Sequence, residues 1–490
     1  MKGDFSRLTF RPRRHYLRVL QQQGRPQLDA DWNEQVAIMM HRLETLTGDL
    51  TGDTHSRSGA PSGIAGFEIG PVTGEADNFT IGRGRYYVDG LVCECDEDTT
   101  YAGQPLPIGE KPDRDGISLV YLDAWEAPVV PLDDPVLLEP ALAGMETTLR
   151  TRVVWQVRTQ RLAPHHNARA PDLAALRTES HAASEHWRAS RRGLLRVRLS
   201  GSRSDPARHP GEAAAARGSP PARTAAGGHF RGPENLLYRI EVHDGGPAGQ
   251  ATFKWSRQNG SVLLPLSSLT GAVAHVAPIA RQAASQWVPG TWLEFSDTFD
   301  RMSGRCRAMV QVVSAETVSG RIQLSASPSG GVDFKPGEAA GIALRQWDQL
   351  SNPASHGGGT AGPSGLPIRE GDHEAHWLDI EDGIQIQFQT GADPRHVYRT
   401  GDYWLVPART ADEGILLRGQ AAQPPDGVEH HYVPLGLFVP QLALVIADYR
   451  PTFQPLAALQ DQVNELTEVV ESLRNQIEEL RDKFVSPARR

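Results

Sequence analysis

The sequence predicts a mainly β protein, with several short-stranded sandwich-like or barrel-like bodies, an N-terminal helix and a C-terminal coiled-coil helix. Glycine and proline, at 48 and 36 of 490 residues, are spread along the chain, which favours many turns and therefore many short strands. Runs rich in β-branched and aromatic residues lie between these turns. The C-terminal stretch differs, because its apolar residues follow a heptad repeat.

We divide the chain where its composition shifts. The predicted segments are an arm and helix at 1–55, a first β-rich domain at 60–162, a flexible low-complexity insert at 163–228, a second β-rich domain at 229–350, a third β-rich region at 351–450 and a coiled coil at 455–485. A chain of 490 residues is long enough for about two to four domains with cores of their own.

Residues 1–55 change from a basic arm into a helix. His15–Leu20 fits a short helical turn. Asp29 or Asp31 can cap the helix that follows, with Glu34 three residues after Asp31 as in a capping box, and Gly48 is expected to end that helix. That helix carries one apolar stripe, formed by Trp32, Val36, Met39, Met40 and Leu43. We expect the stripe to pack onto the body of the protein; a contact between subunits is the alternative.

The β-rich segments contain one strong hairpin signal. Asp89-Gly90 lies between two runs of β-forming residues, Gly84–Val88 and Leu91–Cys95, which is typical of a two-residue hairpin turn. Between 229 and 350, short strands at even spacing with turn residues between them indicate a sandwich or barrel.

Residues 455–485 carry the most regular pattern. Apolar residues recur at alternating steps of three and four, the a/d pattern of a coiled coil, at Leu456, Leu459, Val463, Leu466, Val470, Leu473, Ile477, Leu480 and Phe484. A lone helix of this kind is marginally stable in water, so we expect these residues to form an interface between copies of the chain. The alternative is a helix that folds back onto its own domain.

The number of copies is left open by the pattern. Val and Ile at a with Leu at d favour two strands. The flanking positions offer little charge pairing, and Val469 widens the apolar face, which favours a trimer or a larger bundle. We place a trimer or larger bundle slightly ahead of a dimer.

The sequence indicates no catalytic residues, cofactor site or metal site. Three cysteines, Cys93, Cys95 and Cys306, are too few for a disulfide scaffold and fit a reducing compartment. Cys93 and Cys95 would face the same way on a strand, yet no second pair of ligands lies nearby in the sequence. His243-Asp244 lacks a nucleophile motif such as G-x-S-x-G, so we expect it to cap a turn.

Charge and hydropathy exclude further classes of partner. The net charge is −9 and the pI is about 6.0, so we expect no binding to nucleic acid. The N-terminus has no apolar signal-peptide core, and no stretch is long enough to span a bilayer. We expect a cytoplasmic protein without membrane insertion.

The sequence contains several long motifs: Gly3–Arg7, His15-Tyr16, Gln22–Arg25, Leu28–Gln35, Tyr238–Gly245, Phe253–Arg257, Tyr398–Trp404 and Glu429–Tyr432. With these motifs the chain resembles a bacterial family of uncharacterised function that occurs in gene clusters encoding phage-tail-like contractile injection systems. The resemblance covers most of the chain outside the middle insert and the tail. The family has no catalytic residues that could be assigned to positions of this sequence. The resemblance implies that the protein is one part of such a particle.

The resemblance and the heptad repeat together predict a structural, non-catalytic subunit of such a particle, as a cap or adaptor, a baseplate component or a fibre base. Expected partners are other copies of the chain and the sheath, tube or baseplate proteins. The subunit would assemble in the cytoplasm, and its release with the particle is left open. The alternative function is a receptor-binding or glycan-binding module of the kind found in fibres.

Overall fold

The computed structural model is mainly β, as predicted, and its described residues fall into two compact units. They are residues 4–51, 66–72, 75, 77–108, 111–114, 116–162, 171–189, 193–200, 222–223, 229–277, 287–316, 318–327, 341–349, 361–391, 397–411, 414–417 and 421–485. Unit 1 contains residues 1–124, 147–182 and 431–490, and unit 2 contains residues 125–146 and 183–430. Each unit is therefore built from separate stretches of chain.

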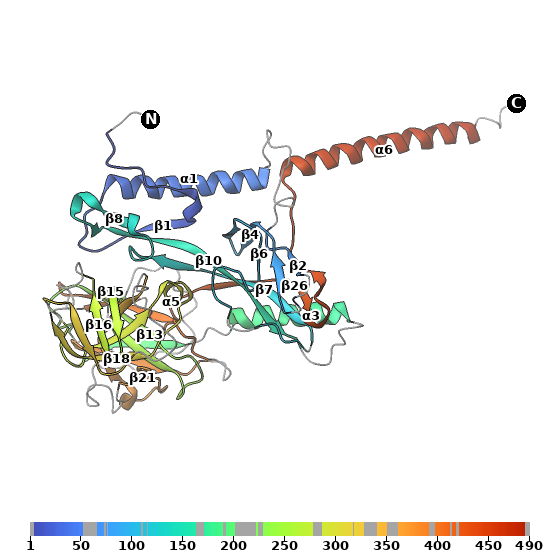
Figure 1. Cartoon of the computed structure of the whole chain (residues 1–490). Coiled ribbons are helices and arrows are strands. Elements are labelled where there is room, and N and C mark those ends of the chain that lie inside the picture. The colour runs from blue at the N-terminus through green and yellow to red at the C-terminus, as the bar shows by residue number, and fades with distance from the viewer. Residues whose placement is uncertain are drawn as a thin grey trace. The chain divides into compact units, whose positions relative to one another are not determined.

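Unit 1 is centred on a sheet of five strands in the order β1-β10-β7-β26-β27. Figure 1 labels four of them, β1, β7, β10 and β26. These strands are β1 (Tyr16–Gln21), β7 (Ser118–Val129), β10 (Thr148–Arg161), β26 (His430–Val439) and β27 (Leu444–Asp448). The sheet joins the N-terminal, middle and C-terminal parts of the chain. The sequence predicted a helical turn at His15–Leu20. Most of these residues instead lie in strand β1, because Tyr16–Gln21 pairs with β10.

Smaller sheets complete the β part of unit 1. They are formed by β2 (Ile69–Pro71), β3 (Phe79–Ile81) and β6 (Thr99–Thr100), and by the pair β4 (Gly84–Val88) and β5 (Leu91–Cys95). The β4–β5 hairpin confirms the Asp89-Gly90 prediction: both turn residues have positive φ, 48° and 89°, as a type I′ turn requires. Cys93 and Cys95 both point into the core of this unit, with Phe67, Phe79 and Phe438.

Unit 2 contains a closed barrel, one of the two architectures that the sequence predicted for residues 229–350. Six strands close in the order β15-β16-β19-β18-β17-β20 around Leu264, Leu293, Phe295 and Ile322. Their bounds are β15 (Leu263–Thr270), β16 (Val273–Val276), β17 (Trp292–Ser296), β18 (Met309–Glu316), β19 (Arg321–Leu324) and β20 (Ala343–Trp347). Closure leaves no open edge among these strands, which is why strands of only four to eight residues suffice here.

Two further sheets of unit 2 share a core around Tyr238, Phe253, Trp255 and Phe388. One has the order β11-β23-β22, the other β12-β25-β24-β13-β14-β21, and a short pair is formed by β8 and β9. Their bounds are β8 (Leu138–Glu139), β9 (Met145–Glu146), β11 (Leu194–Leu199), β12 (Ala222–Arg223), β13 (Leu236–Val242), β14 (Thr252–Ser256), β21 (Leu366–Pro367), β22 (Leu378–Asp379), β23 (Ile384–Gln389), β24 (Tyr403–Arg409) and β25 (Gly414–Leu417).

Strand pairing in these sheets joins segments that the sequence analysis had treated as separate domains. β24 from 351–450 pairs with β13 from 229–350, and β23 pairs with β11, which lies in the predicted insert. The insert at 163–228 also contains the helix α3 (Leu173–Ala189). Its described residues are thus partly regular structure, and residues 201–221 lie outside the described part of the chain.

The other helices are α1 (Asp29–Thr51), α5 (Thr298–Ser303) and α6 (Leu456–Val485). Short 3₁₀ turns occur at Pro12–Arg14, Pro135–Leu137, Pro140–Leu142, Glu374–His376 and Pro440–Leu442. The predicted terminal helices are therefore present. α1 runs past Gly48 to Thr51, and none of the described helices is long and apolar enough to cross a lipid bilayer.

Candidate functional site

The predicted interface residues lie along α6, and their side chains are exposed. Eight of them, from Leu456 to Leu480, have exposed fractions of 45–64 %. We call these eight residues the α6 seam: Leu456, Leu459, Val463, Leu466, Val470, Leu473, Ile477 and Leu480. The side chain of the ninth predicted residue, Phe484, lies outside the described ones. The described residues therefore do not bury the α6 seam in its own unit.

The rest of α6 is polar and makes local contacts. Gln460 donates a hydrogen bond to Asn464 at 3.0 Å, and Arg474 pairs with Glu478 at 3.6 Å, both at a spacing of four residues. Such exposed pairs add only a few tenths of a kcal/mol each. The helix has a single apolar surface, and that surface faces water.

The inward face of α1 is held by buried charges. Arg150 on β10 lies 3.0 Å from Asp31 and 2.7 Å from Glu34, and all three side chains are at most 3 % exposed. The hydroxyls of Thr147 and Thr148 also donate to Asp31. The capping-box prediction for Asp31 and Glu34 is therefore wrong, because α1 already begins at Asp29 and both carboxylates bind Arg150.

The other end of α1 is fixed in the same way. Asp49 accepts hydrogen bonds from the Arg85 guanidinium at 2.9 Å and from the Tyr87 hydroxyl at 2.7 Å. Burial, and then the neighbouring Asp49 carboxylate, raise the pKa of Tyr87, so this hydroxyl keeps its proton. Polar side chains thus attach both ends of α1 to the β part of unit 1.

The arm before β1 lies along α1 and against β5. Ser6 binds Asp29, Thr9 donates to Glu34, and the rings of Phe10 and His41 lie 5.6 Å apart. His15 contacts Glu94 at 2.8 Å and Asp96 at 2.9 Å.

The two carboxylates change the charge state of His15. Its hydrogen bond to Glu94 raises its pKa to about 9 against the opposing effect of burial, with Asp96 adding to the rise. His15 is therefore a cation at neutral pH and holds the arm electrostatically.

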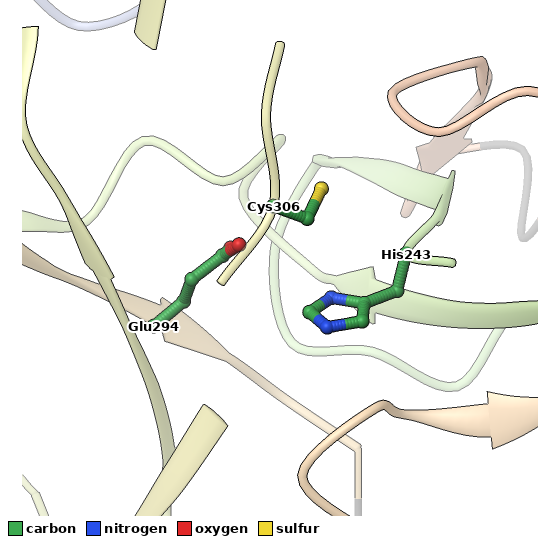
Figure 2. A group of neighbouring side chains, drawn as sticks. All are labelled: His243, Glu294 and Cys306. Carbon is green, nitrogen blue, oxygen red and sulfur yellow. The ribbon is translucent and has the colours of Figure 1, made fainter. Parts of the chain in front are cut away.

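Unit 2 contains three neighbouring side chains of metal-ligating type, which Figure 2 shows; two of them are buried and Cys306 is half-buried. His243 after β13, Glu294 on β17 and Cys306 after α5 point toward one another, with one ligand atom of each inside 4.8 Å of the others. His243 and Glu294 are 2 % and 5 % exposed. A neutral imidazole, a carboxylate and a thiolate are ligands that zinc accepts.

Lys254 supplies the positive charge of this group. Its Nζ atom lies 2.6 Å from Glu294, 3.2 Å from Glu241 and 3.2 Å from the Cys306 sulfur. Glu294 also accepts hydrogen bonds from the Trp347 indole at 2.7 Å and from the Arg307 backbone at 3.0 Å. Both carboxylate oxygens therefore already accept hydrogen bonds, and a metal ion at Oε2 would compete with a buried ammonium group.

The protonation states agree with an ion-pair network. Burial alone would lower the pKa of Lys254, but Cys306, Glu294 and Glu241 outweigh it and raise the pKa. Burial raises the pKa of the Cys306 thiol. Burial, and then the charge of Lys254, lower the pKa of His243 to about 3, so the imidazole is neutral. The Lys254 ammonium, which contacts both Glu294 and the Cys306 sulfur, would compete with a metal ion for these two ligands.

His243 does not have the predicted role in its turn. The backbone N–H of Asp244 donates to Thr252 Oγ1 at 3.1 Å, while the His243 side chain is buried and its Nδ1 atom has no hydrogen-bond partner. The turn is therefore capped by Thr252. His243 instead packs beside the Lys254 ion pairs.

Comparison with known protein families gives one result. The model of a family of unknown function, DUF6519, matches residues 1–193 and 189–438. The chain belongs to the DUF6519 family. Searches of curated proteins and of solved structures found no significant match. Because DUF6519 is a family of unknown function, membership in it indicates no reaction, ligand or partner.

The DUF6519 match includes α1 and the buried charges around Lys254, and it ends before α6. Sequence reasoning missed both charged networks, because their members are up to 119 residues apart. One signal was present in the sequence: Asp31 and Glu34 are one helical turn apart on a face separate from the apolar stripe. That pattern indicates carboxylates with a fixed partner.

Proposed function

We propose that this protein is a structural, non-catalytic subunit of a phage-tail-like contractile injection particle, and that it forms homo-oligomers through the α6 seam. One observation carries the oligomer: eight apolar side chains at a/d spacing lie 45–64 % exposed along one helix of 30 residues. Burying the exposed half of each would contribute roughly 1 kcal/mol per side chain. The place in a particle rests on the motif resemblance.

The structure of the motif residues supports a structural role. Asp31 and Glu34 of the Leu28–Gln35 motif are buried in ion pairs. Lys254 of the Phe253–Arg257 motif is buried too, as are Trp404 and Asp402 of the Tyr398–Trp404 motif. These residues hold the fold together, which is the task expected of a non-catalytic subunit. A trimer or larger bundle, and a location as cap, adaptor, baseplate component or fibre base, are parts of this proposal.

Substitutions in the full-length chain test the oligomer. Val470→Glu with Ile477→Glu places two charges on the α6 seam, whereas Ser472→Glu with Asn475→Glu places them on exposed positions of the same helix outside it. Sedimentation velocity at micromolar concentration should show oligomers for the wild type and the control pair, and monomers for the seam pair. A wild-type protein that sediments as a monomer would disprove the proposal.

The particle role needs its own experiment. Particles are purified from a producing strain, and the protein should co-purify with the sheath and tube proteins. Particles from a deletion strain should lack a defined density in electron micrographs. Recovery of the protein only in fractions without particles, with unchanged particles in the deletion strain, would refute the particle role and leave the oligomer untouched.

A further inference from the structure

A second row of apolar side chains lies exposed on α1. Trp32, Val36, Met39, Leu43, Leu46 and Leu50 recur at alternating steps of four and three, and their exposed fractions are 39–61 %. We call these six residues the α1 seam. The prediction that the stripe packs onto the body is wrong for the described residues.

The orientation of α1 makes this exposure unusual. A surface helix normally turns its apolar stripe toward the core and its charges toward water. In α1 the buried positions include Asp31, Glu34 and Asp49, with Ala30 and Ile38 as the buried apolar residues. Burying carboxylates costs several kcal/mol unless they are paired, so the ion pairs with Arg150 and Arg85 fix this orientation. The fold thus keeps the apolar side of α1 available.

The α1 seam lies next to the start of α6. Tyr87 connects them, because its hydroxyl binds Asp49 near the end of α1 and its ring lies 6.2 Å from Phe453, just before α6. Some Cα atoms of the two helices also lie within 8 Å of one another. Both seams belong to unit 1 and share one heptad spacing. The end of one apolar row is therefore close to the beginning of the other.

We propose that the α1 seam is a second part of the self-association surface, covered by the α1 seams of other copies of this chain. This inference rests on the proposed oligomer. If identical α6 helices form a parallel bundle, rotational symmetry places the copies of α1 around the same axis. The matched heptad spacing then lets the α1 helices pack in register beside that bundle. Met40, 49 % exposed, widens the α1 surface as Val469 widens that of α6.

Cysteine crosslinking in the full-length protein tests the inference. Leu46→Cys probes the α1 seam, and Glu44→Cys is its control on the same helix, exposed but outside the seam. Leu473→Cys and Ser472→Cys form the corresponding pair on α6. A short bismaleimide is added, and wild type gives the background from the native cysteines. Far-UV circular dichroism checks that each variant is folded.

The outcomes are distinct. Conversion of most of the monomer band into crosslinked species for Leu46→Cys and Leu473→Cys, several-fold above Glu44→Cys and Ser472→Cys, supports the inference. Crosslinking of Leu473→Cys alone overturns it and leaves the α6 interface in place; another part of the chain or another protein then covers α1. Failure of both seam variants overturns the inference and the proposed oligomer together.

A solution measurement gives an independent reading. Leu43→Glu places a charge on the α1 seam at a side chain that is 57 % exposed, so the fold of the single chain should not change. The dissociation constant of the oligomer should rise about tenfold or more in sedimentation equilibrium. An unchanged dissociation constant, with Val470→Glu still disrupting the oligomer, would contradict the inference.

Discussion

The Arg150 guanidinium lies 2.7 Å from the Glu34 carboxylate, and their side chains are 3 % and 1 % exposed. Asp31 shares the same Nη2 atom at 3.0 Å. One cation thus joins two carboxylates of one helix to a central strand of the sheet. The pairing decides which side of α1 faces the sheet, and it therefore decides which side is left for other molecules.

Replacing Arg150 should destabilise unit 1 strongly. Arg150→Ala leaves two buried carboxylates without a counter-ion, which costs about 3–5 kcal/mol of unfolding free energy. Arg161→Ala on the same strand is the control, since Arg161 and Asp113 are 43 % and 42 % exposed and such pairs contribute at most about 1 kcal/mol. Urea denaturation measures both. Equal effects of the two variants would show that burial of the Arg150 pair is unimportant.

The His15 contact should make stability depend on pH. The pKa of His15 is raised from 6.5 to about 9 in the folded protein. Its stabilising effect is therefore complete below pH 6.5 and is lost as the pH rises through about 9. His15→Asn keeps a residue that tolerates the positive φ of 52° but removes the charge.

Urea midpoints at pH 6 and pH 9.5 check the His15 prediction. Wild type should be more stable than His15→Asn by roughly 1–2 kcal/mol at pH 6. The difference should largely disappear at pH 9.5, because the histidine is then neutral in both the folded and unfolded states. A difference that stays constant between the two pH values would mean that His15 acts by packing alone.

Replacing Gly90 or Gly48 with alanine should change the stability of the protein in opposite directions. Gly90 has φ of +89° in the β4–β5 turn, so Gly90→Ala should cost about 1–2 kcal/mol. Gly48 lies inside α1, and a Cβ atom there meets no atom within 4 Å. Gly48→Ala should therefore stabilise the protein by about 0.5–1 kcal/mol through its helix propensity. Thermal unfolding compares the variants, and shifts of the same sign would contradict the prediction.

Lys254 should be essential for the stability of unit 2. Lys254→Met keeps much of the side-chain volume but leaves Glu241 and Glu294 without the ammonium that both contact, which should cost about 3–5 kcal/mol. Adding Glu294→Gln removes one of the unpaired charges and should recover part of the loss. Denaturation of the single and double variants measures this. A double variant no more stable than Lys254→Met would argue against the charge explanation.

Local patterns predicted the regular elements well. The sequence identifies the β4–β5 hairpin because Asp89-Gly90 is chemically specific, and it identifies α6 because the heptad repeat runs unbroken to Leu480. In each case the residues that decide the structure are close together in the chain.

Relationships between distant residues were not predictable in this way. Asp31 meets Arg150, Lys254 meets Glu294, and β11 pairs with β23, so each partner depends on the whole topology. The outward stripe of α1 was misread for the same reason. Amphipathicity gives a helix one apolar side, but only the ion pairs that Arg150 and Arg85 form with buried carboxylates of α1 determine that this side points away from the sheet.

The strand order of the large sheet also sets the sequence of events during synthesis. β26 lies between β7 and β27, and unit 1 draws on the first 124 residues as well as on residues after 430. On the ribosome, unit 2 has all its strands once residue 430 has emerged, whereas unit 1 must wait for the last strands. Newly made chains therefore leave the β26 side of β7 unpaired until β26 has been synthesised.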